Sequence, residues 1–360
     1  FNSEETEMFT PTRGLRQGDP LSPYLFLLCA EGLSRLLAHE EEIGGIQGIR
    51  VCRGAPSVSH LLFANDSLIL MRADASNATS LRNALDMYCA SSGQLVSDAK
   101  SSIFFSPNTT VEVREEVCTQ LNIVVEAMTD KYFGLPFHVG IERSDCFQHL
   151  VDRVWALIDG WNARMLSAGG KEVLLKSVAQ SIPVYAMSVF SLPKNICKSI
   201  CDAVARYWWG GSQSQNKLHW KAWWKMCIPK KEGGMGFRYL HCFNQAMLAK
   251  QCWRLLSEPE SLCAQVLCAK YYPDGDLSNA VLKKGSSFTW GSIMAGLKTL
   301  KRGAIWRPGN GASINIWSDL WIPTPYDRRV MTPRGHCLLE TVKDLIDPHT
   351  GEWDVQCLAN

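Results

Sequence analysis

HLLFANDSLILM, residues 60–71, is the segment from which the fold of the first half of the chain can be predicted. Two apolar runs flank a short polar segment, Ala64-Asn65-Asp66-Ser67. Short apolar runs on both sides of a polar turn predict a β-hairpin. A carboxylate, Asp66, lies in the turn, and a neutral amide, Asn65, precedes it. Asn-Asp-Ser is good turn chemistry by itself, so these residues alone leave open whether Asp66 has a chemical role.

A segment rich in glycine and arginine, RGLRQGDPLSP (13–23), precedes a predicted helix. Ser22 suits the N-cap and Pro23 suits the first helical position, so the helix should begin there. Apolar or small residues at three- and four-residue spacing predict its buried face: Leu21, Leu25, Leu28, Gly32 and Leu36.

The same segment is a candidate anion site. Arg16 supplies a guanidinium group, Gln17 supplies an amide, and Gly18 lets a ligand approach the backbone closely. The N-terminus of the following helix adds free N–H groups and the positive end of a dipole, which suit a triphosphate. An ordinary loop before a well-capped helix is the alternative that these residues leave open.

Further elements follow from periodicity and turn residues. A helix is predicted over 76–92 with Gly93 as its cap, a short strand over 101–107, and a strand, a turn and a strand over 130–140. Helices dominate afterwards, at about 144–165, 169–181, 193–209 and 241–257, and two short strands are predicted around PGNG within 305–323. Changes of pattern near Ile141 and near 272–275 predict domain boundaries.

Composition excludes some classes of protein. The chain has 360 residues, of which 46% are hydrophobic, and no run approaches the ~18 apolar residues of a membrane span. Its 14 cysteines form no C-x-x-C pair, and Cys197 and Cys201 are spaced for one helix face. We therefore expect buried, reduced cysteines in an intracellular protein, with a zinc site as the less favoured alternative. Because the sequence opens at Phe1, we expect it to be part of a longer product.

The charge is distributed unevenly. Residues 1–150 hold 11 Lys or Arg and 19 Asp or Glu, whereas residues 151–360 hold 26 and 16. The most basic window, 213–254, has eight basic residues and one acid, Glu232. An asymmetry of this size suggests a polyanion as partner of the second half, although a solvated lysine-rich face would look the same.

Tryptophans are concentrated in this basic window. Five of them, Trp208, Trp209, Trp220, Trp223 and Trp224, alternate with basic side chains. Aromatic faces stack on exposed bases while lysines track phosphates, so a nucleic-acid contact is one interpretation. The other is that most of the rings are core, with Trp220 and Trp224 forming an apolar stripe, and we favour this for most of them. The lysines predicted to contact nucleic acid are Lys217, Lys221, Lys225, Lys230 and Lys231.

Four blocks, in order, resemble the reverse transcriptases of plant non-LTR (LINE-type) retrotransposons. Residues 13–37 resemble the loop and helix that line the nucleotide and template pocket, and residues 60–71 resemble the catalytic hairpin, usually Phe/Tyr-Ala-Asp-Asp. SSGQLVSDAKSSIFFS (91–106) resembles the segment whose lysine lies near the incoming phosphates, and YFGLPFHVG (132–140) resembles the primer grip. GWNARMLSAGGKEVLLKSVAQSIPVYAMSVFSLP (160–193) and the tryptophan-rich blocks after it resemble the thumb and connection region.

The resemblance implies roles for particular residues. Asp66 matches a magnesium ligand, whereas Asn65 occupies the position of the more critical hairpin aspartate. Arg16, Gln17 and Gly18 would bind nucleotide and template, and Lys100 would lie near phosphate, unless it is simply a solvated lysine. The implied partners are an RNA template and a DNA primer. The family's first catalytic strand would lie upstream of residue 1. Because this strand is missing and Asn65 replaces an aspartate, we expect weak or lost Mg²⁺ binding and no polymerisation from this chain.

The prediction is therefore an α+β protein with a right-hand polymerase palm, an antiparallel sheet with helices, followed by a mostly helical thumb and connection region. Its parts are a partial palm at 1–140, the helical region at 141–272 and a Trp/Gly/Pro-rich segment at 273–360. The predicted function is that of a reverse transcriptase with a degenerate catalytic hairpin, inside the cell and in the nucleus. The alternatives are a non-catalytic nucleic-acid-binding protein and a decayed remnant.

Overall fold

The computed structural model describes residues 14, 16, 18–123, 131–132, 135–136, 139, 143–161, 166–210, 217–324 and 327–359. The chain divides into two compact units. Unit 1 comprises Phe1–His138 with Glu258–Ala280, and unit 2 comprises Val139–Ser257 with Val281–Asn360. The fold is α+β, as the sequence predicts; the three-part division at residues 140 and 272 stays a prediction.

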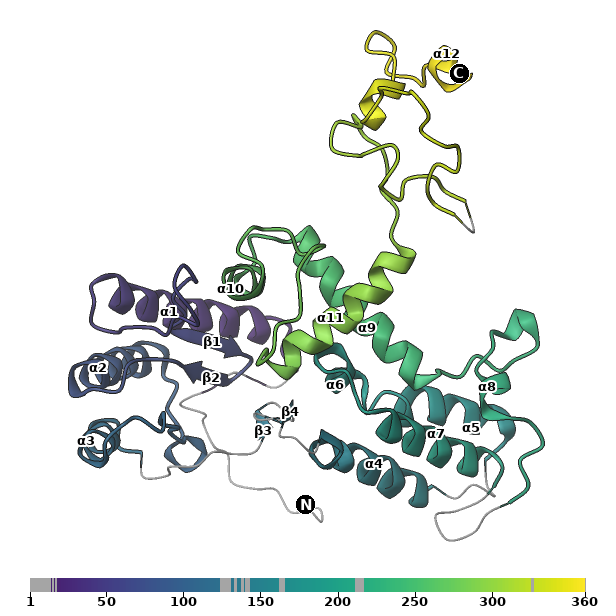
Figure 1. Cartoon of the computed structure of the whole chain (residues 1–360). Helices are drawn as coiled ribbons and strands as arrows, with labels where there is room; N and C mark the ends of the chain where they lie inside the picture. Colours follow the sequence, from purple (N-terminus) through teal and green to yellow (C-terminus); the bar gives the residue numbers. More distant parts are fainter. Residues whose placement is uncertain are drawn as a thin grey trace. The chain divides into compact units, whose positions relative to one another are not determined.

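Unit 1 combines helices with the predicted hairpin (Figure 1). Its elements are α1 (Ser22–Glu42), β1 (His60–Phe63), β2 (Asp66–Ile69), α2 (Ala75–Ser92), the 3₁₀ turn η1 (Asp98–Lys100), α3 (Val111–Leu121), β3 (Lys131–Tyr132), β4 (Leu135–Pro136) and α10 (Leu262–Tyr271). The β1–β2 pair is antiparallel, with His60 opposite Ile69. One apolar core, which includes Leu37, Ile46, Ala78 and Val117, joins α1, α2 and α3 behind the hairpin.

The buried face of α1 differs from the prediction. Leu33 and Leu37 are buried, whereas the predicted Leu21, Leu25 and Leu28 are exposed. The helix also begins one residue earlier than predicted, because Leu21 is the N-cap and Ser22 is already helical. Ser22 instead donates its hydroxyl to the carbonyl of Arg16 at 2.8 Å. Two leucine rows with helical spacing share this helix, and packing against α2 selects one of them.

The other strands and caps of unit 1 agree with the sequence in part. Gly93 ends α2 with φ of +72°, as the glycine predicts, and β3 pairs with β4 in the predicted strand-turn-strand segment. The strand predicted at 101–107 is wrong. That segment contains one bridging residue, Ile103, and anchors Phe105 in the core instead of extending a sheet.

Unit 2 is mostly helical, close to the predicted pattern. Its elements are α4 (Arg143–Asp159), α5 (Ala168–Leu174), the π-helix η2 (Leu175–Ala179), α6 (Val184–Val189), α7 (Lys194–Trp208), α8 (Trp223–Met226), η3 (Lys230–Glu232), α9 (Leu240–Ser257), α11 (Phe288–Gly303), η4 (Val342–Leu345) and α12 (Val355–Ala359). Helices α9 and α11 pack together closely (Figure 1), and the Sγ of Cys252 lies 3.1 Å from the carbonyl oxygen of Ile293.

The C-terminal part of unit 2 has a small core of its own. Ile314, Ile316, Val342 and Leu345 form that core. The two strands predicted around PGNG are wrong, because neither forms. The Trp306 N–H donates across the segment to the carbonyl of Leu320, but residues 314–316 pair with residues 340–342 instead. Ile316 N–H donates to the carbonyl of Glu340, and Val342 N–H donates to that of Ile314.

The sequence analysis expected no membrane span and expected buried, reduced cysteines. In the described part of the chain, no helix is both long enough and apolar enough to cross a membrane. All 14 cysteines lie among the described residues and are thiols, not disulfides, and Cys197 and Cys201 are both buried on α7. Burial raises the pKa of the Cys197 thiol to about 12, which keeps it protonated at neutral pH.

Candidate functional site

The hairpin presents its polar residues at a two-residue turn. Phe63 pairs with Asp66, so Ala64 and Asn65 alone connect the strands. Ala64 has φ of +49°, a left-handed conformation that glycine or asparagine adopts more readily. Asn65 and Asp66 are both exposed. The tight turn therefore holds an amide and a carboxylate side by side at the surface.

A small pocket of about 30 Å³ lies beside this turn. Its lining comes from α1, the hairpin and α2 with the residues after it: Phe26, Ala30, Leu33, Leu62, Ala64, Asn65, Ser67, Tyr88 and Gln94. The Tyr88 hydroxyl donates to the Gln94 side-chain oxygen at 2.9 Å. Asn65 lines this pocket but Asp66 does not, so its polar groups are all neutral. No local sequence pattern identifies Tyr88 or Gln94 as a pocket residue.

The residues at the hairpin do not fit a two-magnesium centre. Two magnesium ions require carboxylate oxygens from more than one acid. Asn65 offers only a neutral carbonyl oxygen. Across the described ranges, no group of three or more His, Cys, Asp or Glu side chains is placed to hold a metal ion. Asp66 is thus a single acid at an exposed turn.

The predicted nucleotide-binding residues are placed as follows. Arg16 is exposed just before α1, and Gly18 has φ of +85°, a conformation that requires glycine. Gln17 lies outside the described residues. Lys100 is exposed at the end of η1. Among the described residues, no hydrogen bond or ion pair joins Arg16 or Lys100 to the hairpin.

The predicted nucleic-acid lysines form a surface around α8 and η3. All five are exposed. The Lys230 ammonium lies 2.8 Å from the Glu172 carboxylate, and the Lys221 ammonium donates to the carbonyl of Gly233 at 2.9 Å. The Lys225 ammonium lies 5.5 Å from the ring centre of Trp224. Lysines 217, 221 and 225 are therefore exposed close to Trp220 and Trp224 in the sequence, and Lys225 lies against an indole ring.

The tryptophans divide between core and surface. Trp223 packs on buried Phe237 with ring centres 4.8 Å apart, and Trp208 packs on the same ring at 5.4 Å. The apolar stripe predicted for Trp220 and Trp224 is wrong. Trp220 lies before the four-residue α8 and is 80% exposed, and Trp224 is 58% exposed. Two indole faces among lysines are thus open to solvent, and we call Lys217, Trp220, Lys221, Trp224 and Lys225 the Lys–Trp surface.

Comparisons with known proteins bear on both units. Residues 1–137 match the family model described as reverse transcriptase (RNA-dependent DNA polymerase). The chain is 38% identical over 184 residues to a putative ribonuclease H protein of Arabidopsis thaliana, covering 50% of this chain and 30% of that protein. It is 38% identical over 143 residues to an uncharacterized mitochondrial protein of the same plant, covering 39% of this chain and 93% of that protein. A second uncharacterized mitochondrial protein is 54% identical over 67 residues, which are 19% of this chain and 55% of its own length.

Proposed function

The chain belongs to the reverse transcriptase family, and from that premise we propose that it is a LINE-type (non-LTR) member that binds single-stranded nucleic acid without polymerising DNA. The order of its sequence blocks supports the LINE-type assignment. For active relatives with two hairpin aspartates, we infer Mg²⁺ as the cofactor and an RNA template with a DNA primer as partners.

The observation that carries the binding proposal is the exposure of the Lys–Trp surface. Trp220 and Trp224 expose most of their side chains, although burial of such rings is normally favourable. Stacking on a base would cover an indole face and contribute about 1–3 kcal/mol per base. The neighbouring lysine ammonium groups are positioned to neutralise phosphates on the same strand. Aromatic faces alternating with cations match a single strand with unstacked bases.

The absence of polymerase activity is proposed from the hairpin. Two metal ions must be held together during nucleotidyl transfer, and a neutral amide at position 65 leaves Asp66 without a neighbouring anion. Loss of one electrostatic contact in a preorganised site costs about 10²–10³ in rate, and a lost metal ligand should cost at least as much. A primer-extension assay with Mg²⁺ should therefore give no product, and robust incorporation by the unmodified chain would refute this part of the proposal.

Binding is tested by filter retention of a labelled single-stranded oligonucleotide over a series of salt concentrations, with and without Mg²⁺. We expect affinity that falls steeply with salt and does not depend on Mg²⁺. The double variant Lys217→Gln/Lys225→Gln should reduce the affinity and flatten the salt dependence. The matched control Lys283→Gln/Lys284→Gln removes the same charge from two other exposed lysines of unit 2 and should change little.

A different outcome would favour the remnant. Background retention at every salt concentration would leave no binding function and would refute the proposal.

The nuclear location also stays a proposal, supported by the resemblance to retrotransposon proteins. Microscopy of a fluorescent fusion would check it, and an exclusively mitochondrial signal would contradict it.

A further inference from the structure

We propose a second contact for single-stranded nucleic acid, in the C-terminal part of unit 2 and separate from the Lys–Trp surface. It consists of Arg302, Trp306, Arg307, Arg328 and Arg329, which we call the Arg–Trp patch. This inference goes beyond the proposed function, because it assigns a ligand to a segment outside the matched reverse transcriptase residues.

Backbone contacts bring the two halves of the patch together. The Trp306 N–H donates to the carbonyl of Leu320 at 2.6 Å, so the segment after α11 lies against the segment that leads to Arg328. The Arg328 guanidinium donates to the carbonyl of Arg302, and the Arg328 carbonyl accepts from Trp321 N–H at 3.0 Å. Arginines separated by more than twenty residues therefore lie on adjoining segments around one tryptophan.

The patch carries unneutralised positive charge. Residues 298–334 contain seven Lys or Arg and two acids, Asp319 and Asp327. The Asp319 carboxylate accepts from the N–H of Asn315 at 2.7 Å, so the backbone and not an arginine holds it. Within the described residues, the four arginines of the patch form no ion pair with a carboxylate. Four guanidinium groups without an acidic partner favour an anionic ligand.

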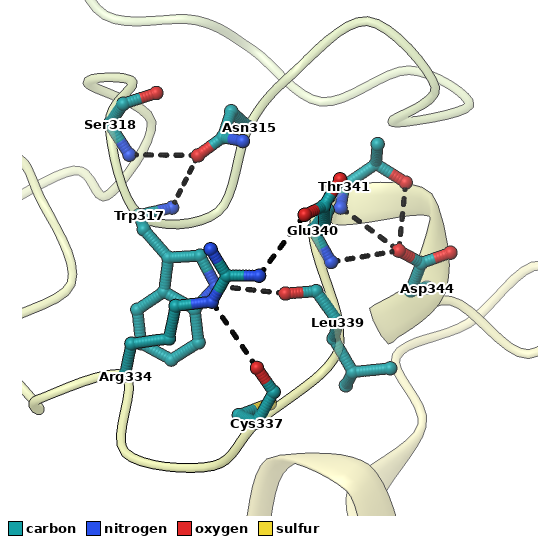
Figure 2. Close-up of polar contacts among 9 residues, drawn as sticks. All are labelled: Asn315, Trp317, Ser318, Arg334, Cys337, Leu339, Glu340, Thr341 and Asp344. Carbon is teal, nitrogen blue, oxygen red and sulfur yellow. Dashed lines mark hydrogen bonds and ion pairs between the residues drawn. The ribbon is translucent and has the colours of Figure 1, made fainter.

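A second segment that contributes to the same small core differs in charge. Residues 340–354 contain five acids and one lysine. Figure 2 shows that Arg334, next to this acidic segment, pairs with Glu340 at 3.1 Å, and that the Asp344 carboxylate accepts from the Thr341 N–H at 2.9 Å. Positive charge near residue 340 is thus neutralised internally, whereas that of the patch is not. The positive charge that is left for a ligand therefore belongs to the segments around Trp306.

Trp306 indicates which anion fits. Its side chain is 56% exposed, whereas Trp317 is partly buried and donates its indole N–H to the carbonyl of Leu339. An exposed indole face gains most from a planar partner, and arginine planes stack on bases as well as binding phosphate. A single strand offers alternating phosphates and accessible bases, whereas a duplex hides its bases and a free phosphate has none. The patch therefore fits a single strand.

Cross-linking of the full chain to a single-stranded oligonucleotide containing 5-bromodeoxyuridine, followed by mass spectrometry of the peptides, tests the assignment. We expect adducts at Trp306 as well as on the Lys–Trp surface. Adducts on the Lys–Trp surface alone would overturn this inference and leave the proposed function intact. Adducts at Trp306 alone would support it and contradict the proposed function, and none at either place would overturn both.

Variants separate stacking from charge. Trp306→Ala should weaken binding of a base-containing oligonucleotide about fivefold or more and leave binding of an abasic one unchanged, and Trp306→Phe should restore most of the loss. Arg307→Gln/Arg329→Gln should lower the salt slope by about 1.4, whereas Lys283→Gln/Lys284→Gln should not.

Three results would overturn the proposal that the Arg–Trp patch binds single-stranded nucleic acid. The first is an equal change of salt slope in the two double variants. The second is an equal loss of affinity for base-containing and abasic strands in Trp306→Ala. The third is that, when binding to vesicles of anionic lipid is measured in parallel, the variants lose affinity for the vesicles and not for the oligonucleotide. Thermal unfolding of each variant provides the check on folding.

Discussion

Phe63 and Asp66 form the last cross-strand pair of the β1–β2 hairpin, which leaves only Ala64 and Asn65 to make the turn. This pairing fixes the amide of position 65 next to the carboxylate of position 66. Because Asn65 lines the adjoining pocket and Asp66 does not, the group that faces the pocket is neutral. Three of the predictions below concern this hairpin, and a fourth concerns the contact between α9 and α11 in unit 2.

Asn65→Asp should strengthen binding of divalent cations. The substitution places a second carboxylate beside Asp66, and hard cations prefer charged oxygen ligands over a neutral amide. Calorimetric titration with Mn²⁺ should show at least a tenfold tighter complex, on the order expected for one added anionic ligand. Asn65→Ser, which adds no charge, is the control. Tight binding by the unmodified chain would show that a neutral residue suffices at this position.

Ala64→Gly should stabilise unit 1. At φ of +49°, alanine suffers a steric cost of about 1–2 kcal/mol that glycine avoids, while glycine loses about 0.4–1 kcal/mol through its freer unfolded chain. The net gain in the free energy of unfolding should be about 0.5–1 kcal/mol in denaturant titration. Ala64→Val should act in the opposite direction, because a β-branched residue tolerates this conformation least. Equal stability of all three proteins would argue against a left-handed turn residue.

His60 should make the stability of unit 1 depend on pH. Its Nε2 lies 2.8 Å from the Ser34 hydroxyl and its Nδ1 lies 3.0 Å from the Ser59 hydroxyl. Burial lowers the pKa of His60 below its ordinary 6.5, and the nearby Glu41 carboxylate opposes this only in part. The unfolded chain therefore takes up the proton at higher pH, so the free energy of unfolding should fall as the pH drops below about 6.5.

Denaturant titrations of the parent and of His60→Gln between pH 8 and pH 5 measure this effect. The difference between their pH profiles isolates His60 from the other histidines. Parallel profiles would mean that the folded and unfolded chains bind the proton on His60 equally well.

Gly296→Ala should destabilise unit 2. A Cβ at this position of α11 would lie 2.5 Å from the backbone carbon of Leu248 on α9, so the two helices would have to separate. Overpacking of this kind costs about 1–3 kcal/mol. Gly291 lies on the same helix with no atom within 4 Å of its added Cβ. Gly291→Ala should instead raise stability by about 0.5–1 kcal/mol through helix propensity. Loss of stability in both variants would indicate a cause other than the α9–α11 contact.

Local patterns predicted much of the fold. The hairpin at 60–71, the glycine cap at residue 93 and the helices α4, α5, α7 and α9 follow from short-range periodicity and turn chemistry, which act whatever surrounds them. Helices α3, α10 and α11 were not predicted. The strands predicted at 101–107 and around PGNG failed because apolar runs of that length suit a strand or an irregular core segment equally well. The sequence also shows that a neutral residue, Asn65, occupies the position of the first hairpin aspartate, because this requires only the alignment of one motif.

The sequence thus specified which residues carry charge, which can turn the chain, and which element follows which, because those properties belong to single residues and their near neighbours. Long-range packing selected Leu33 and Leu37 as the buried row of α1, left Trp220 and Trp224 in solvent, and placed Arg302 beside Arg328. Two rows of leucines satisfy the same helical period, and an indole in a loop has no period at all. Contacts between residues far apart along the chain therefore had to choose among arrangements that were locally equivalent.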